Sequence, residues 1–268
     1  DKETLKGINE KLSLLSLQFG NNLLAENSSF KLVVDNEEDL NGLPQSSIDA
    51  AAEQAKKDGM EGKWVFTLSK PSLIPFLQYA HNRDLREKIY MGYVMRGNND
   101  NANDNKEIIE EMSKLRLHKA QLLGYEDYAS YVLEANMAKD VPTVDKFLAD
   151  LFKPALKVAK KELKELQEIA DFQTLYTEPV TVESWDWWYY AEMLRKAKYN
   201  FDENELKPYL SLNNVRDGMF MVANKLYGIT FNQRTDIPVY FDGVETWEVK
   251  EKDGSHIGII YLDYYPRD

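Results

Sequence analysis

The chain has 268 residues, with 33 Lys and Arg against 45 Asp and Glu, a formal charge of −12 at pH 7, and no cysteine. This acidic balance argues against nucleic acid as a partner, and the lack of cysteine excludes disulfides, thiolate metal ligands and cysteine nucleophiles. No apolar run reaches the roughly 18 residues that a membrane helix needs, so we expect no membrane partner. Cytoplasm and periplasm both fit this composition.

Apolar residues recur at helical spacing over most of the chain, which predicts a mainly α fold. In chain order we expect helices near residues 5–19, 46–57, 71–80, 83–96, 106–123, 125–136, 143–171, 185–200, 203–209 and 214–227. Short strands at residues 30–34 and 64–68 can pair as a small hairpin, and strands at 246–250 and 256–265 flank a turn at 252–255. The chain therefore divides into a helical region, residues 1–228, and a β-hairpin region, residues 229–268.

The helix expected at residues 143–171 has two unlike halves. Its first half carries the residues of a face that we expect to be buried: Val144, Phe147, Leu148, Leu151 and Phe152. Its second half is mostly charged from residue 157 to residue 168, with few apolar residues to anchor it. We therefore expect the second half to lie on the surface.

An aromatic cluster surrounds a single acid in the run Trp185-Asp186-Trp187-Trp188-Tyr189-Tyr190. With Ser184 as N-cap, Asp186 falls in the first helical turn, where a carboxylate is favoured by free amides and by the helix dipole. Helical spacing places Trp185, Trp188 and Tyr189 on one face. Both a buried core helix and a ligand-stacking surface fit this composition, and the core helix is the commoner use.

The residues alone predict no catalytic group and no metal ligand set. His81, His118 and His256 are isolated in sequence, whereas a zinc hydrolase typically pairs two His one helical turn apart. The chain has no Gly-x-Ser-x-Gly elbow and no phosphate-binding glycine loop. The Asn-rich run from Asn99 lacks the central Gly and final Glu of a calcium loop, so helix capping at Asp104 or Asn105 is the favoured interpretation.

Ordered motifs between about Arg96 and Asp268 indicate a family. They include Trp185-Asp186-Trp187-Trp188-Tyr189-Tyr190-Ala191-Glu192, Leu226-Tyr227-Gly228-Ile229-Thr230-Phe231 and Tyr261-Leu262-Asp263-Tyr264-Tyr265-Pro266-Arg267. In these motifs the chain resembles the thimet oligopeptidase and neurolysin family of zinc metallopeptidases. Within that family it is most similar to the bacterial peptidyl-dipeptidases, also called dipeptidyl carboxypeptidases.

The resemblance implies a large helical clamshell whose deep channel admits short unstructured peptides. In this family zinc is held by a His-Glu-x-x-His helix and a later Glu, and zinc with the motif Glu activates water. Those residues are expected downstream of this chain, so the chain itself is expected to bind no zinc and to be inactive. Its expected partners are short peptides and the remaining C-terminal catalytic part of the same protein.

Two functions stay open at this point. The first is an incomplete segment, upstream of the zinc helix, of an enzyme that removes C-terminal dipeptides from short peptides. The second is a helical interaction module without chemistry, which the composition alone permits.

Within the first function, the resemblance suggests a role in positioning substrate. We expect Tyr261, Asp263 and Arg267 to lie near the channel, with Trp185 and Asp186 supporting its wall. An exposed strand edge there could hold an extended peptide through main-chain hydrogen bonds. Simple packing and ion pairing would account for the same five residues equally well.

One departure from the family pattern limits the resemblance. The family usually has His-Pro after the Val-Tyr pair, whereas Phe241 and Asp242 follow Tyr240 here. Any role of a histidine at that place is therefore absent from this chain.

Overall fold

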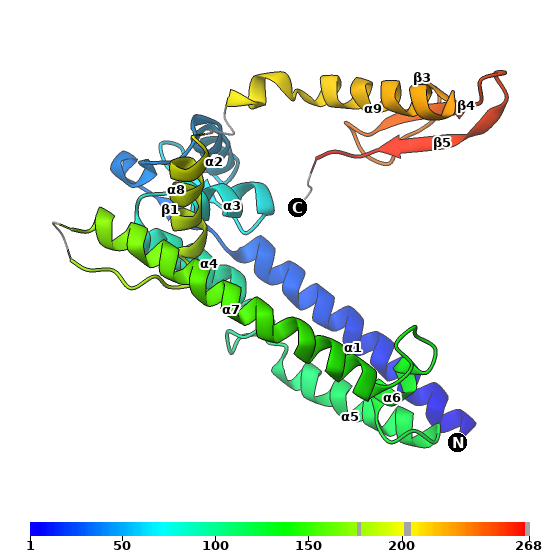
Figure 1. The fold of residues 1–268 in the computed structure, drawn as a ribbon. Helices are drawn as coiled ribbons and strands as arrows, with labels where there is room; N and C mark the ends of the chain where they lie inside the picture. Colours follow the sequence, from blue (N-terminus) through cyan, green and yellow to red (C-terminus); the bar gives the residue numbers. More distant parts are fainter. Residues whose placement is uncertain (176–177, 201–204, 266–268) are drawn as a thin grey trace. The chain divides into compact units, whose positions relative to one another are not determined.

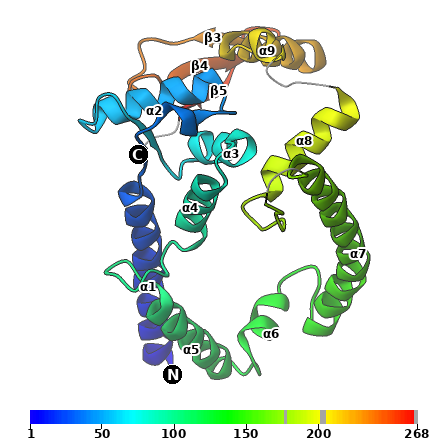
Figure 2. The same cartoon turned by 90° about the vertical axis from the view of Figure 1, so that its left-hand side faces the viewer.

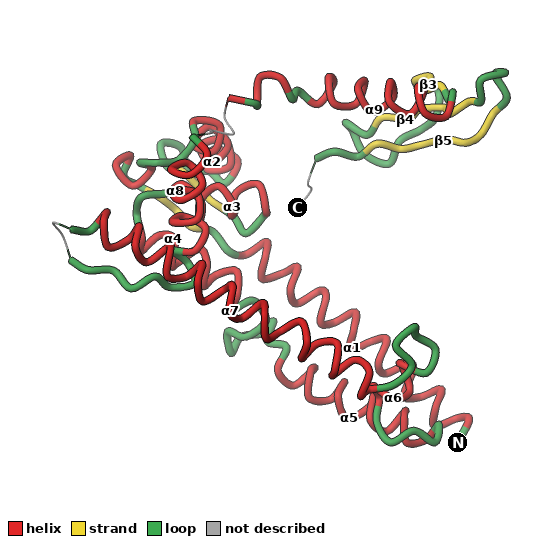
Figure 3. Tube along the Cα trace, in the orientation of Figure 1, coloured by secondary structure: helices red, strands yellow, loops and turns green. Residues whose placement is uncertain are grey.

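A computed structural model describes residues 1–175, 178–200 and 205–265. The described chain is mainly α with a small antiparallel β element near its C-terminus, which confirms the fold class expected from the periodicity (Figures 1 and 3). It forms two compact units, residues 1–198 and 199–268, and each unit is described by itself.

The first unit is built almost wholly from helices. In chain order it contains α1 (Lys2–Ser29), β1 (Leu32–Val34), the 3-10 turn η1 (Glu37–Leu40), α2 (Gln45–Lys57), β2 (Trp64–Phe66), α3 (Lys70–Tyr79), α4 (Arg83–Val94), α5 (Lys106–Leu122), α6 (Tyr128–Leu133), α7 (Val141–Gln173) and α8 (Trp187–Tyr199), which runs to the boundary. Strands β1 and β2 pair antiparallel, with Leu32 opposite Phe66. Among the described helices of the chain, none is long and apolar enough to cross a membrane.

The main core of this unit lies between the β1–β2 pair and helices α2, α3 and α4. Phe66 of β2 and Phe76 of α3 meet edge to face at its centre, with ring centroids 4.6 Å apart. Gly92 on α4 faces the ring of Phe30, so a β-carbon at position 92 would clash with that ring. Close packing at this point therefore depends on the absence of a side chain.

Helices α1 and α5 lie side by side, as both views show (Figures 1 and 2). The loop that precedes α5 is fastened to α1 through Glu26, whose buried carboxylate accepts hydrogen bonds from the amides of Asn99, Asn101 and Asn103. The Asn-rich run is therefore a structural clamp.

The start of α5 differs in detail from the expected cap. Asp104 does bond the first helical amide, since its Oδ1 accepts from the backbone N–H of Lys106 at 2.9 Å. Asn105 precedes the helix, but its buried side chain accepts from Asn22 and donates to the carbonyl of Phe19. Asn105 thus joins α5 to α1 and does not cap α5.

The prediction for the first half of α7 was wrong, and the prediction for the second half was right only in part, since residues 157–164 are exposed as expected. Phe147, Leu148, Leu151 and Phe152 in its first half are exposed, whereas Leu166 and Ala170 in its second half are buried. The second half packs against α8 because Leu166 and Ala170 lie one turn apart on a face that the charged residues leave clear. No described residue of the first unit buries Phe147, Leu148, Leu151 or Phe152.

The second unit places a helix on a sheet. It contains η3 (Lys207–Tyr209), α9 (Leu212–Tyr227), β3 (Thr230–Gln233), β4 (Glu245–Lys250) and β5 (His256–Leu262). The strands form an antiparallel sheet in the order β3-β4-β5. Of the helix expected near residues 203–209, residues 203 and 204 lie outside the described part, and the 3-10 turn η3 is what the structure shows.

Local signals set the ends of these elements. Gly228 ends α9 in the left-handed conformation with φ 77°, one residue after the end expected for this helix. Phe220 of α9 stacks on Phe231 of β3 with ring centroids 4.1 Å apart, and it meets Trp247 of β4 at 4.8 Å. These three rings fix the helix on one face of the sheet.

Candidate functional site

Asp186, the single acid of the aromatic cluster, is enclosed by the protein. Its side chain is fully buried and accepts hydrogen bonds from two arginines of α4. Arg86 donates from Nη2 to Oδ1 at 2.8 Å, and Arg83 donates from Nη2 to Oδ2 at 2.8 Å and from Nε at 3.0 Å. The backbone N–H of Glu183 adds a bond to Oδ2 at 3.1 Å. Both oxygens are therefore fully used inside the protein.

Aromatic rings cover the same two arginines. The Arg86 guanidinium lies 4.0 Å from the ring centre of Tyr189, and that of Arg83 lies 5.6 Å from Trp185. Two guanidinium groups, one carboxylate and two rings thus form one layer that joins α4 to the start of α8. These contacts hold the start of α8 against α4, and they leave Asp186 inaccessible to a ligand.

The start of α8 differs from the sequence prediction. The helix begins at Trp187, and the backbone carbonyl of Asp186 accepts its first bond, from Tyr190. Ser184 is not the N-cap, because the arginines hold Asp186 just ahead of the helix. Tyr190 is buried and Trp188 is exposed, so the expected face through Trp185, Trp188 and Tyr189 was wrong.

Sequence reasoning missed Arg83 and Arg86 as partners of Asp186. The available signal was their spacing, because two arginines three positions apart at a helix start face one way. Asn82 caps that helix by accepting from the backbone N–H of Leu85, which fixes the first turn in which both arginines lie.

Tyr261 and Asp263 lie together at the end of β5. Tyr261 is 44% exposed, and its ring centre lies 6.4 Å from that of Tyr240. The Tyr240 hydroxyl donates to Oδ2 of Asp263 at 2.8 Å. Tyr240 therefore contacts both Tyr261 and Asp263, the two residues that the sequence predicted to lie near the channel. The sequence pointed to Tyr240 only as the residue before Phe241 and Asp242. Arg267 lies outside the described residues.

Strand β5 is at an edge of the three-stranded sheet in the described part of the chain. One side of its backbone pairs with β4, from Glu245 opposite Leu262 onwards. The other side meets no strand among the described residues, so its N–H and C=O groups can pair with an added extended chain. Tyr261, which is partly exposed, belongs to this strand.

No described residues form a group of three or more His, Asp or Glu side chains that could hold a metal ion. On the sheet, His256 Nδ1 lies 3.0 Å from Oε1 of Glu248. Arg234 and Lys250 also bind Glu248, and its pKa is lowered, chiefly by the hydrogen bond from His256 and against desolvation. Positive side chains already surround this carboxylate, so the set does not fit a zinc ion.

A sequence profile described as Peptidase family M3 matches residues 76–268. The chain belongs to peptidase family M3. This family assignment agrees with the resemblance that the ordered motifs indicated. The match includes α4 with Arg83 and Arg86, the aromatic run around Asp186, and β5.

Curated relatives of the M3 chain align along almost all of it. It is 36% identical to the dipeptidyl carboxypeptidase of Escherichia coli over 269 residues, which cover 100% of this chain and 39% of the relative. Oligopeptidase A of the same species is 35% identical over 96% of this chain and 38% of the relative. Organellar oligopeptidase A of Arabidopsis thaliana is 35% identical, over 99% of this chain and 34% of the relative. The chain thus spans well under half the length of these relatives.

Proposed function

We propose that this chain is a segment of a zinc-dependent metallopeptidase that removes dipeptides from the C-termini of short peptides. The observation that carries the proposal is the 36% identity to a dipeptidyl carboxypeptidase along the entire chain. Both compact units take part in that alignment. A helical module that merely shared one motif would not align over its full length.

In this proposal the segment supplies the wall of a substrate channel, and the zinc ligands and general base come from the rest of the protein. Zinc would supply Lewis-acid activation of water for attack on the peptide carbonyl. The residues described here would position the peptide. The free edge of β5 would pair with its backbone, and Tyr261 and Asp263 would contact its side chains or its end.

Trp185 and Asp186 would act differently, as support for that wall. Asp186 is closed off by Arg83 and Arg86, so it would keep α8 in place without contacting substrate. Arg267, outside the described residues, would be a further contact of the peptide in this proposal.

The test compares the complete polypeptide with residues 1–268 purified alone. Each is analysed for bound zinc and incubated with a short N-terminally blocked peptide that has a free C-terminal carboxylate. We expect zinc and stepwise release of C-terminal dipeptides, read by mass spectrometry, with the complete polypeptide and neither with residues 1–268.

A second peptide, identical but amidated at its C-terminus, is the control for exopeptidase action. If the complete polypeptide cuts both peptides at internal bonds, the removal of dipeptides is rejected although a peptidase remains. If the complete polypeptide binds no zinc and cuts neither peptide, the metallopeptidase is rejected in favour of a non-catalytic helical module.

A further inference from the structure

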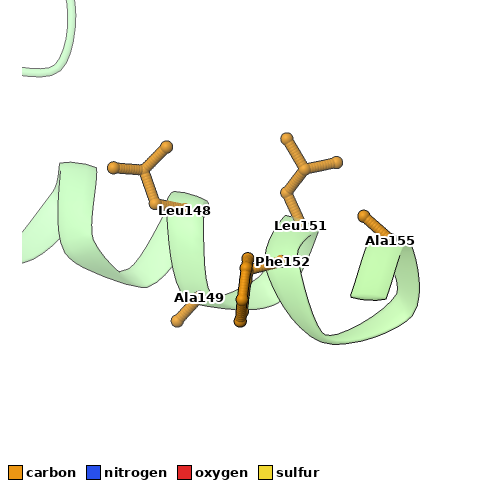
Figure 4. Close-up of a pocket in the computed structure, with 5 residues that line it drawn as sticks. All are labelled: Leu148, Ala149, Leu151, Phe152 and Ala155. Atoms are coloured by element: carbon orange, nitrogen blue, oxygen red, sulfur yellow. The ribbon is translucent and has the colours of Figure 1, made fainter. Parts of the chain in front are cut away.

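The first half of α7 carries an apolar face that no described residue of the first unit buries. We define the α7 stripe as Phe147, Leu148, Leu151, Phe152, Ala155 and Leu156. Leu148 is 52% exposed and Phe152 is 62% exposed. Figure 4 shows Leu148, Leu151 and Ala155 projecting from the same side of the helix around a shallow apolar hollow. A contiguous apolar surface of more than a few hundred Å² typically marks an interaction site in a soluble protein.

The stripe continues without a break into the core of the first unit. From Leu148 and Phe152 the apolar positions recur three or four residues apart and reach Leu163, then Leu166 and Ala170. Leu166 is 2% exposed and Ala170 0%, because both pack with Tyr189 and Tyr190 of α8. One helix face is thus covered at its C-terminal end and open at its N-terminal end.

The opposite face of α7 has the character of a solvent-facing surface. Lys153, Lys157 and Lys160 point away from the stripe by their helical spacing, and all three are exposed. None of them forms an ion pair with another described residue. The helix is therefore amphipathic along its length, with a face that suits burial and a face that suits water.

We infer that the α7 stripe is the docking surface for an apolar helix of the same polypeptide, from the part that lies outside residues 1–268. The inference rests on the proposed function, which supplies that remaining part. The E. coli dipeptidyl carboxypeptidase aligns with this chain over only 39% of its own length, so a relative of this kind has ample further chain. Apolar residues spaced by three and four form the ridges that a second helix packs against.

Continuity with the core favours this occupant over a second copy of the chain. The buried end of the face is an intramolecular contact between α7 and α8, and the stripe extends that contact along one line. A helix that covers the stripe next to the α7–α8 contact would complete one core within one molecule.

Thiol labelling tests the inference, because residues 1–268 contain no cysteine. Ala155→Cys places a small thiol in the middle of the stripe with little change in volume, and Lys153→Cys is the matched control on the opposite face. Each variant is prepared both as residues 1–268 and as the complete polypeptide. The rate of alkylation at that position is read from the corresponding peptide by mass spectrometry.

In residues 1–268 we expect the two thiols to react at similar rates that do not depend on protein concentration. In the complete polypeptide we expect alkylation of Ala155→Cys to slow at least tenfold relative to Lys153→Cys. A photo-crosslinker attached at position 155 should then capture a peptide from outside residues 1–268. Leu148→Cys repeats the measurement two turns away in case the Ala155 variant does not fold.

Two results would overturn the inference. The first is equal reactivity of both thiols in the complete polypeptide. The second is protection of Ala155→Cys in residues 1–268. Protection that grows with concentration would make a second copy the occupant, and protection at every concentration would make residues 199–268 the occupant. Zinc content and peptide cleavage of the unsubstituted complete polypeptide separate the two proposals, because an active enzyme with an unprotected stripe rejects only this inference.

Discussion

Arg86 and Asp186 lie 100 residues apart in sequence and form an ion pair closed to solvent, with Nη2 and Oδ1 at 2.8 Å. Their side chains are 1% and 0% exposed. A buried charge that loses its partner is strongly destabilising, because neither water nor another ion replaces it. This pair therefore makes the placement of α8 depend on α4.

Asp186→Ala should destabilise residues 1–268 severely. The variant leaves Arg86 buried without a carboxylate, and removing one partner of such a pair costs about 3–5 kcal/mol. The measurement is the free energy of unfolding in urea, followed by far-ultraviolet circular dichroism. Glu183→Ala, at an exposed position three residues away, should change this free energy by at most about 0.5 kcal/mol. Similar effects of the two substitutions would contradict the structural role of Asp186.

Stability in acid should depend on Glu26. The hydrogen bond from Asn101 lowers the pKa of Glu26 below 4.5, against desolvation and with help from Asn99 and Asn103. Because the folded-state pKa is depressed, the stabilisation is complete above the unfolded-state pKa and is lost as pH falls through the folded-state pKa.

Glu26→Gln should therefore reduce stability at neutral pH and weaken the loss of stability below about pH 4.5. The cost at neutral pH should be about 1–3 kcal/mol, since the amide donors lose a charged acceptor. Unfolding curves in urea at several pH values measure both effects. Glu10→Gln, at an exposed position on the same helix, is the control, and a pH profile shifted as much by this change would reject the role of Glu26.

Two helical glycines should respond in opposite directions to alanine. At Gly92 a β-carbon would lie 2.2 Å from Cε2 of Phe30, so Gly92→Ala should destabilise by about 1–3 kcal/mol through overpacking. At Gly20 a β-carbon meets nothing within 4 Å, so Gly20→Ala should stabilise α1 by about 0.5–1 kcal/mol. Melting temperatures of the two variants measure the contrast. Stabilisation by both substitutions would show that Phe30 does not pack against α4 in this way.

Tyr261→Ala, made in the complete polypeptide, tests the proposed role of β5. If Tyr261 contacts the peptide before and during reaction, KM should rise with little change in kcat. A rise of about tenfold would equal about 1.4 kcal/mol of lost binding. Tyr227→Ala, at an exposed tyrosine on α9, is the control and should leave both constants unchanged. Tyr261→Phe shows whether the ring suffices, and unchanged kinetics of Tyr261→Ala would remove this residue from the substrate wall.

Local signals in the sequence predicted much of the fold. Periodicity predicted most of the helices in chain order, and glycine after α9 marked its end because an L-residue side chain resists the left-handed conformation there. The turn before β5 was equally readable, with Gly254 at φ 87°. These features depend on residues within a few positions of one another.

Features that depend on distant partners were not predictable in the same way. The run around Asp186 showed that an acid would be enclosed, but its two arginines come from another helix. At α7 the pattern showed which face of the first half is apolar, but it could not show whether another segment buries that face. Asn105 likewise stood at the right place for a cap, yet α1 offered its side chain a better set of hydrogen bonds.

The clamp at Glu26 also makes this loop sensitive to deamidation of its asparagines. Asparagine side chains hydrolyse slowly to aspartate, and each such event in this loop would replace an amide donor with a second negative charge beside Glu26. Repulsion between the carboxylates would then release the loop from α1. Aged samples should accumulate molecules that are one dalton heavier at Asn99, Asn101 or Asn103, and those molecules should be the first to be cut by proteases at the start of α5.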